Sequence, residues 1–97
     1  MTINEMMISR NVFLVAEQVC TDVAIVQQRK RFGCDQEYLK EITKETSEMI
    51  FKYSDKYGKA FSHKIANALN IIGFTSVPVY ESNKLIALIV NGFEFKR

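Results

Sequence analysis

The sequence predicts an α+β fold in which three helices are followed by a three-stranded antiparallel meander. Apolar residues recur every three or four positions as far as Ile72, the period of an amphipathic helix, and every second position from Phe74 onward, the period of a strand. The four glycines fall between these segments or in the last turn. We expect helices over about residues 3–32, 36–57 and 60–72 and strands over about 75–81, 84–90 and 93–97.

Composition limits the class of protein. A chain of 97 residues has room for one domain, so we assign residues 1–97 to a single domain. Hydrophobic residues make up 47% and charged residues 25%, which is typical of a globular protein and excludes a disordered or collagen-like chain. The formal net charge of +2 is too small to indicate nucleic-acid binding by itself.

The first helix has a start signal, an apolar stripe and a stop signal. Thr2 and Glu5 have the spacing of a capping box, and Gly33 follows the last turn. Because the stripe consists almost entirely of β-branched residues, two strands over the same stretch remain an alternative. The stripe consists of Ile8, Val12, Val15, Val19, Val23 and Val26.

The later helices are marked in the same way. Asp35 is placed to cap the second helix, Gly58 ends it, and Gly73 ends the third. The expected buried residues are Leu39, Ile42, Met49, Ile50 and Tyr53 in the second helix and Phe61, Ile65, Ala68, Leu69 and Ile72 in the third.

The two turns of the meander define a register. A two-residue turn at Ser82-Asn83 pairs Glu81 with Lys84, and one at Asn91-Gly92, a strong hairpin signal, pairs Val90 with Phe93. Regular alternation from these pairs opposes Val79 to Ile86, Val77 to Leu88 and Leu88 to Phe95. One face of the sheet would then carry Val77, Val79, Ile86, Leu88, Val90, Phe93 and Phe95, and the other would leave Leu85, Ala87 and Ile89 to be covered.

The residues capable of chemistry are scattered. Cys20 and Cys34 are too far apart along the first helix and its loop for a disulfide, so we expect reduced thiols and a cytoplasmic protein without a membrane span. His63 is the only histidine, and no ligand-type residues flank it at metal-binding spacing. We therefore predict no catalytic set, no metal and no cofactor, although an active site assembled between subunits remains open.

Charged residues are segregated into opposite clusters. An acidic face of Glu37, Glu41, Glu45 and Glu48 follows the second helix and is a candidate docking face for a basic partner. The segment 51–64 combines lysines with aromatic residues, as nucleic-acid surfaces do. The candidate contacts to a partner or to nucleic acid are Lys52, Lys56, Lys59, His63 and Lys64, together with Arg29, Lys30 and Arg31 at the end of the first helix.

Two functional hypotheses follow. The first is a small non-enzymatic, cytosolic protein-binding factor, such as a regulator, inhibitor or accessory protein of a bacteriophage or mobile element. Such a factor would bind an unidentified protein partner and form a homodimer or higher oligomer. The alternative is a winged-helix-like transcriptional regulator that binds nucleic acid through segment 51–64. The expected oligomer interface comprises Ile8, Val12, Val15, Val19, Val23, Val26, Leu85 and Ile89.

Overall fold

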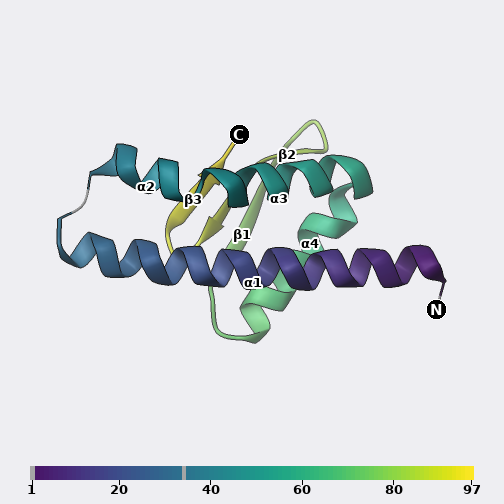
Figure 1. Ribbon diagram of the computed structural model, residues 1–97. Helices are drawn as coiled ribbons and strands as arrows, with labels where there is room; N and C mark the ends of the chain where they lie inside the picture. Colours follow the sequence, from purple (N-terminus) through teal and green to yellow (C-terminus); the bar gives the residue numbers. More distant parts are fainter. Residues whose placement is uncertain (1, 34) are drawn as a thin grey trace.

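The computed structural model describes residues 2–33 and 35–97 and shows the predicted fold class, helices followed by a three-stranded antiparallel meander. Figure 1 shows the long helix α1 crossing the whole molecule, with α2 and α3 running above it. The elements are α1 (Ile3–Arg31), α2 (Gln36–Ile42), α3 (Lys44–Tyr57), α4 (Lys59–Ile71), β1 (Ser76–Glu81), β2 (Lys84–Val90) and β3 (Phe93–Lys96).

The signals at the ends of the first two helices are confirmed. The Thr2 hydroxyl accepts a hydrogen bond from the Glu5 backbone N–H, which is the N-cap half of a capping box, and donates to the Glu5 carboxylate, which therefore bonds to the hydroxyl and not to the Thr2 backbone N–H. Asp35 accepts from the backbone of Glu37 at the start of α2. The alternative of two strands over the first segment is wrong, because residues 3–31 form one continuous helix.

The prediction of one helix over residues 36–57 is wrong, because Thr43 divides it. The Thr43 hydroxyl donates to the carbonyl oxygen of Leu39 at 2.9 Å, and the Thr43 backbone lies at φ −101° and ψ 1°. A threonine that bonds back to the preceding turn bends a helix, and a β-branched residue resists the helical rotamer. The four observed helices therefore replace the three predicted ones, with α2 and α3 meeting at an angle.

The two turns of the meander form as predicted, but the register between β1 and β2 does not. Glu81 pairs with Lys84 and Val90 with Phe93, as expected. A β-bulge in β2 then adds one residue, so Val79 lies opposite Ala87 rather than Ile86, and Val77 lies opposite Ile89 rather than Leu88. Alternation therefore changes phase at Ile86.

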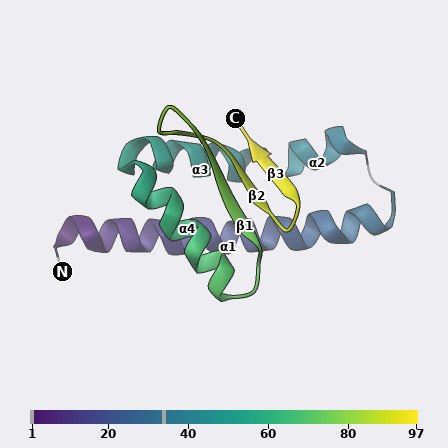
Figure 2. The same ribbon diagram turned by 180° about the vertical axis from the view of Figure 1, so that it is seen from behind.

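The bulge changes which side chains the sheet buries. Leu85, on one side of the bulge, and Leu88, on the other, are both buried, although they are three positions apart. Val77, expected in the core, is half exposed, and Leu85, expected on the outer face, is in the core. Figure 2 shows the strands in front of α1 and α3, α4 beside β1 and no helix in front of the sheet.

The core lies between the helices and the inner face of the sheet. Side chains of α1 pack against those of α3 and α4, and the sheet packs on α3 and α4. The fully buried large side chains are Val15, Val19, Val23, Val26, Leu39, Ile50, Phe61, Ile65, Leu69, Leu88, Val90 and Phe95.

The structure corrects the predicted oligomer interface. Val15, Val19 and Val23 have no exposed surface, and Val26 has 1%. Their partners are other parts of the same chain, because α3 and α4 cover this face of α1. Ile8 and Val12 are half-buried against the same core, and Leu85 is buried in it. Of the proposed set, Ile89 alone lies on the uncovered side of the sheet, where it is half-buried.

The Asn91-Gly92 turn provides a stability prediction. Both residues have positive φ, 49° and 82°, as a type I′ turn requires. An added Cβ at Gly92 would meet no atom within 4 Å, so any cost of substitution comes from backbone strain. We expect Gly92→Val to lower the free energy of unfolding by about 1–3 kcal/mol, measured by urea denaturation. Gly92→Asn is the control and should cost less, because asparagine tolerates positive φ; equal losses would contradict the strain account.

Candidate binding groove beside strand β3

A groove of about 760 Å³ runs along strand β3. Its walls come from the last turns of α1, from α2, from the first turns of α3 and from β3 itself. The aromatic rings of Phe51 and Phe93 line its buried part.

Strand β3 presents a free edge to this groove. In a two-residue hairpin the residues flanking the turn, here Val90 and Phe93, exchange backbone hydrogen bonds, and so does the pair two positions on, Leu88 and Phe95. The backbone N–H and C=O of Glu94 therefore point away from β2. No strand pairs with this edge within the described residues, so these groups are available to an added strand.

The opposite edge of the sheet, on β1, is already protected. The Asn70 side chain accepts a hydrogen bond from the Ser76 backbone N–H at 2.9 Å and donates to the Ser76 carbonyl oxygen at 3.4 Å. Pro78, two positions further on the same edge, has no N–H to offer. An extended peptide would therefore find its backbone partners on β3 rather than on β1.

The groove is predominantly basic. Lys40 and Lys44 stand on α2 and α3 with exposed side chains, and neither forms an ion pair among the described residues. Two acidic residues also line the groove, and one of them, Glu94, lies 3.6 Å from Lys96. The basic residues that line the groove are Lys30, Lys40, Lys44, Lys96 and Arg97.

Arg97 fixes one end of the groove. Its guanidinium forms two hydrogen bonds to the Asp55 carboxylate of α3, donates from Nε to the Leu85 carbonyl oxygen at 2.7 Å and lies 4.6 Å from the centroid of the Phe51 ring. These hydrogen bonds lower the pKa of Asp55, and the nearby Lys84 adds to the effect. Arg97 thus ties the chain beyond β3 to α3 and to the floor of the groove.

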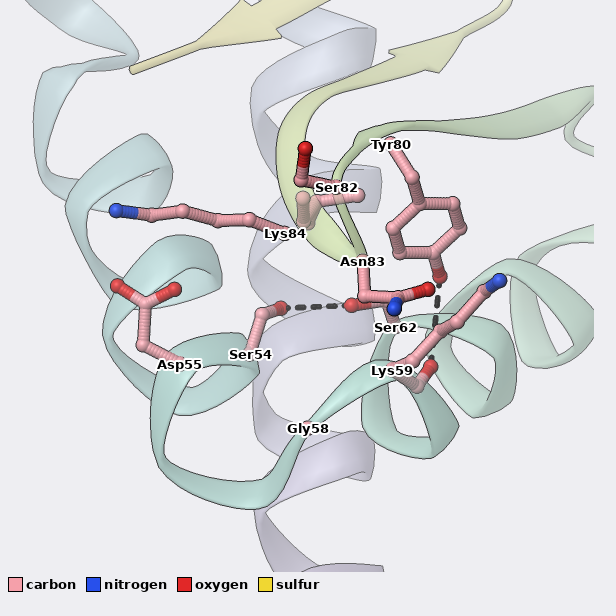
Figure 3. Close-up of a pocket in the computed structure, with 10 residues that line it drawn as sticks. Ser54, Asp55, Gly58, Lys59, Ser62, Tyr80, Ser82, Asn83 and Lys84 are labelled. Carbon is pink, nitrogen blue, oxygen red and sulfur yellow. Dashed lines mark hydrogen bonds between the residues drawn. The ribbon is translucent and has the colours of Figure 1, made fainter.

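A second hollow, of about 210 Å³, lies between the α3–α4 junction and the β1–β2 turn. Figure 3 shows that its polar groups bond to one another: Ser62 donates to Ser54 at 3.0 Å, and the Tyr80 hydroxyl donates to the Lys59 carbonyl oxygen at 3.4 Å. Partial burial raises the pKa of Tyr80. Because its inner hydroxyls are partnered, this small hollow offers less to a ligand than the groove does.

The predicted acidic face is divided by the break at Thr43. Glu37 and Glu41 lie on α2, Glu45 and Glu48 on α3, and all four are exposed. Glu48 lines the groove, whereas the other three do not.

The structure buries two of the four rings of segment 51–64. Phe51 and Phe61 are buried, and Tyr53 and Tyr57 pack against Phe61 with ring centroids 5.8 and 5.4 Å from it. Tyr57 also accepts a hydrogen bond from Asn11 on α1. Tyr53 and Tyr57 are partly buried, and the amino groups of Lys52 and Lys56 lie 5.7 and 5.3 Å from their respective ring centroids.

The basic residues of segment 51–64 are exposed but dispersed. Lys52 and Lys56 lie on α3, and Lys64 lies on α4. Lys59 and His63 flank the Tyr80 ring, 4.8 Å and 5.4 Å from its centroid.

The predicted cluster at the end of α1 also divides. Lys30 points into the groove, where its amino group lies 5.9 Å from the Phe93 ring. Arg29 stands over the Tyr38 ring of α2, and Arg31 is exposed. Sequence reasoning thus found one residue of the groove here, Lys30, but missed Lys40, Lys44 and Arg97. Their chain separation gave no sign that they share a site.

Three further predictions concern the cysteines, a metal site and a membrane span. Cys20 is a free thiol on α1, and partial burial raises its pKa; Cys34 lies outside the described residues. Over residues 2–33 and 35–97 no three potential ligands among His, Cys, Asp and Glu gather as a metal site would require. None of the described helices combines the length and the apolar character needed to cross a bilayer.

Comparisons with known proteins give no indication of function, so a functional proposal has to be based on the geometry of the site. No family model matches the chain, and no curated protein or solved structure matches it either.

The Arg97–Asp55 pair provides a pH-dependent prediction. Because the pKa of Asp55 is lowered in the folded state from 3.8, the pair contributes stability above that pH, and this contribution is lost as the pH falls through the folded-state pKa. We expect Arg97→Gln to lower the urea midpoint at pH 7 and to have a smaller effect at a pH below the folded-state pKa of Asp55, where this carboxyl group is protonated in both proteins. Asp55→Asn should show the same reduced pH dependence; a deficit of equal size at both pH values would contradict the role of the ion pair.

Proposed function

We propose that this protein is a protein-interaction module that binds an extended, acidic segment of a partner polypeptide by adding it as a fourth strand beside β3. The observation that carries the proposal is the coincidence of two features in one place. A sheet edge with free backbone groups borders a groove whose five basic side chains outnumber its two acidic ones. Strand addition supplies affinity through the backbone, and the groove supplies selectivity through side chains.

The geometry indicates what the bound segment would look like. β3 is four residues long, so an added strand of about four to six residues would cover it. Successive side chains of that strand point to opposite faces. One set would point toward the helices, where Lys30, Lys40 and Lys44 stand, and the other would continue the uncovered outer face of the sheet. Acidic residues at every second position therefore match the groove.

The size and charge of the chain favour binding over catalysis. The residues that line the groove include lysines, carboxylates and hydroxyls, whereas His63 and Cys20 lie elsewhere. The oligomeric, cytosolic regulator predicted from the sequence fits this proposal, with the partner's acidic segment as its target.

The nucleic-acid alternative depends on a different surface. Lys52, Lys56 and Lys64 would contact phosphates with limited help from the rings of segment 51–64, since Phe51 and Phe61 are buried and the partly buried Tyr53 and Tyr57 pack on Phe61. Helix α4 does expose His63, Lys64 and Asn67 to solvent, and these are the residues that a winged-helix protein would place in a groove of DNA. The two hypotheses can therefore be separated by variants on separate surfaces.

Paired charge reversals test which basic surface binds. The probe is a fluorescein-labelled peptide of alternating aspartate and valine, measured by fluorescence anisotropy. We expect Lys40→Glu combined with Lys44→Glu to weaken binding by about tenfold or more, because two attractive contacts become repulsive. The matched control is Lys52→Glu combined with Lys56→Glu, which makes the same change of charge outside the groove and should leave affinity within about twofold.

A proline substitution tests strand addition itself. Glu94→Pro removes a backbone N–H that faces the groove but no hydrogen bond between β2 and β3, so the protein should stay folded and lose most of its affinity for the peptide. Glu94→Gln is the control for the lost charge and should bind at least as well as the wild type. Equal loss in both lysine pairs, or full affinity in Glu94→Pro, would overturn the proposal. Salt-sensitive binding of duplex DNA, abolished by the Lys52 and Lys56 reversals alone, would favour the alternative.

A further inference from the structure

Helix α1 has a second apolar face, opposite to the one in the core. At 100° per residue, Arg10 and Glu17 point almost directly away from Val15, Val19 and Val26. Figures 1 and 2 both show the N-terminal part of α1 projecting beyond α3 and α4, so no other element covers it there. The exposed apolar residues of the outward surface are Ile3, Met6, Met7, Phe13, Leu14 and Ile25.

The apolar side chains of this face are unusually exposed to solvent. Phe13 is 67% exposed and Leu14 45%, although they are neighbours near the middle of α1. Single exposed apolar residues are common, but a row of them along one helix marks an interaction surface. The row follows heptad-like steps, since Met7 and Leu14 stand seven positions apart, as do Met6 and Phe13.

The charges within the row are arranged to match a second copy of the same helix. Arg10 and Glu17 lie along the centre of the outward face, and the point midway between them falls at Phe13 and Leu14. Neither forms an ion pair with another described residue. A second helix running antiparallel about that midpoint sets each Arg10 opposite the other copy's Glu17. A parallel pair at the same level instead sets like charges against each other.

The apolar residues obey the same symmetry. A two-fold axis at the midpoint brings the two Phe13 side chains together on one side of the charged row and the two Leu14 side chains together on the other. Toward the ends, Ile3 of each copy comes level with Ala24 of the other, one residue from Ile25. The rest of each protomer stays clear of this contact, because its core and its sheet lie on the opposite face of α1.

From this self-complementarity we infer that a second copy of the chain covers the outward face of α1, forming an antiparallel two-fold dimer centred on Phe13 and Leu14. This dimer uses a different face of α1 from the buried valine stripe. It is also independent of the peptide groove, which lies beside β3.

The test is a charge swap followed by analytical ultracentrifugation. The wild type should sediment as a dimer of the 11.2 kDa chain at tens of micromolar. Arg10→Glu alone and Glu17→Arg alone should each raise the dimer dissociation constant by about tenfold or more, because each sets like charges face to face twice. Both substitutions together restore opposite charges and should return the constant to within about threefold of the wild type.

Two further measurements keep the result unambiguous. Leu14→Lys should give a monomer whose circular dichroism and urea midpoint match those of the wild type, since Leu14 lies outside the core. In a background with Cys20→Ser and Cys34→Ser, Leu14→Cys should form a disulfide-linked dimer under oxidation, whereas Gln27→Cys, on the flank of the helix, should not. A folded wild-type monomer at 200 µM, or a dimer that the charge swap does not rescue, would overturn the inference.

Discussion

The burial of one face of α1 is the constraint on which the rest of the structure depends. Helices α3 and α4 both pack on this face, and the sheet packs in turn on α3 and α4. Each fully buried valine of the stripe contributes about 1.5–3 kcal/mol relative to an exposed one. Helix α1 runs the full length of the molecule, and α3 and α4, which both pack on its stripe, also pack on each other. The same helix must then present its other face to the outside, and that face is also apolar.

Local chemistry explains why so much of the fold could be predicted. Helix ends depend on a cap or a glycine, and the two hairpin turns depend on residues that accept positive φ. Thr2 and Asp35 therefore mark the starts of helices, and Gly92 marks a turn. The bulge at Ile86 could not be predicted in this way, because its cause is not local. Leu85 and Leu88 both face the helices, and their odd spacing is incompatible with regular alternation. An uninterrupted apolar run from residue 85 to 90 was the available signal that the strand changes face.

The candidate site was harder to predict than the fold, because its residues belong to different elements and come together only through the packing of those elements. Lys30, Lys40 and Lys44 belong to three helices, α1, α2 and α3, and only the packing of these helices brings them to one groove. The oligomer hypothesis correctly noted that α1 carries more apolar surface than one stripe, but it assigned the contact to the valines. The valines recur at three- and four-residue steps and share the face that α3 and α4 cover, whereas Phe13 and Met6 fall on the other side of α1.

The position of the groove relative to the outward face of α1 has a consequence for binding. Lys30, near the end of α1, reaches the groove from the side that faces β3, whereas Leu14 and Phe13 point away from the body of the protein. A partner segment beside β3 and a second copy on α1 therefore do not compete for space. In the antiparallel dimer the two grooves are related by the two-fold axis and lie toward opposite ends of the paired helices. A partner with two acidic segments joined by a linker long enough to span them would bind through both grooves at once, and its affinity would exceed that of one segment by an amount set by the effective concentration of the second. The weak affinity expected of a short strand addition would then be sufficient, because dimerisation supplies the second contact.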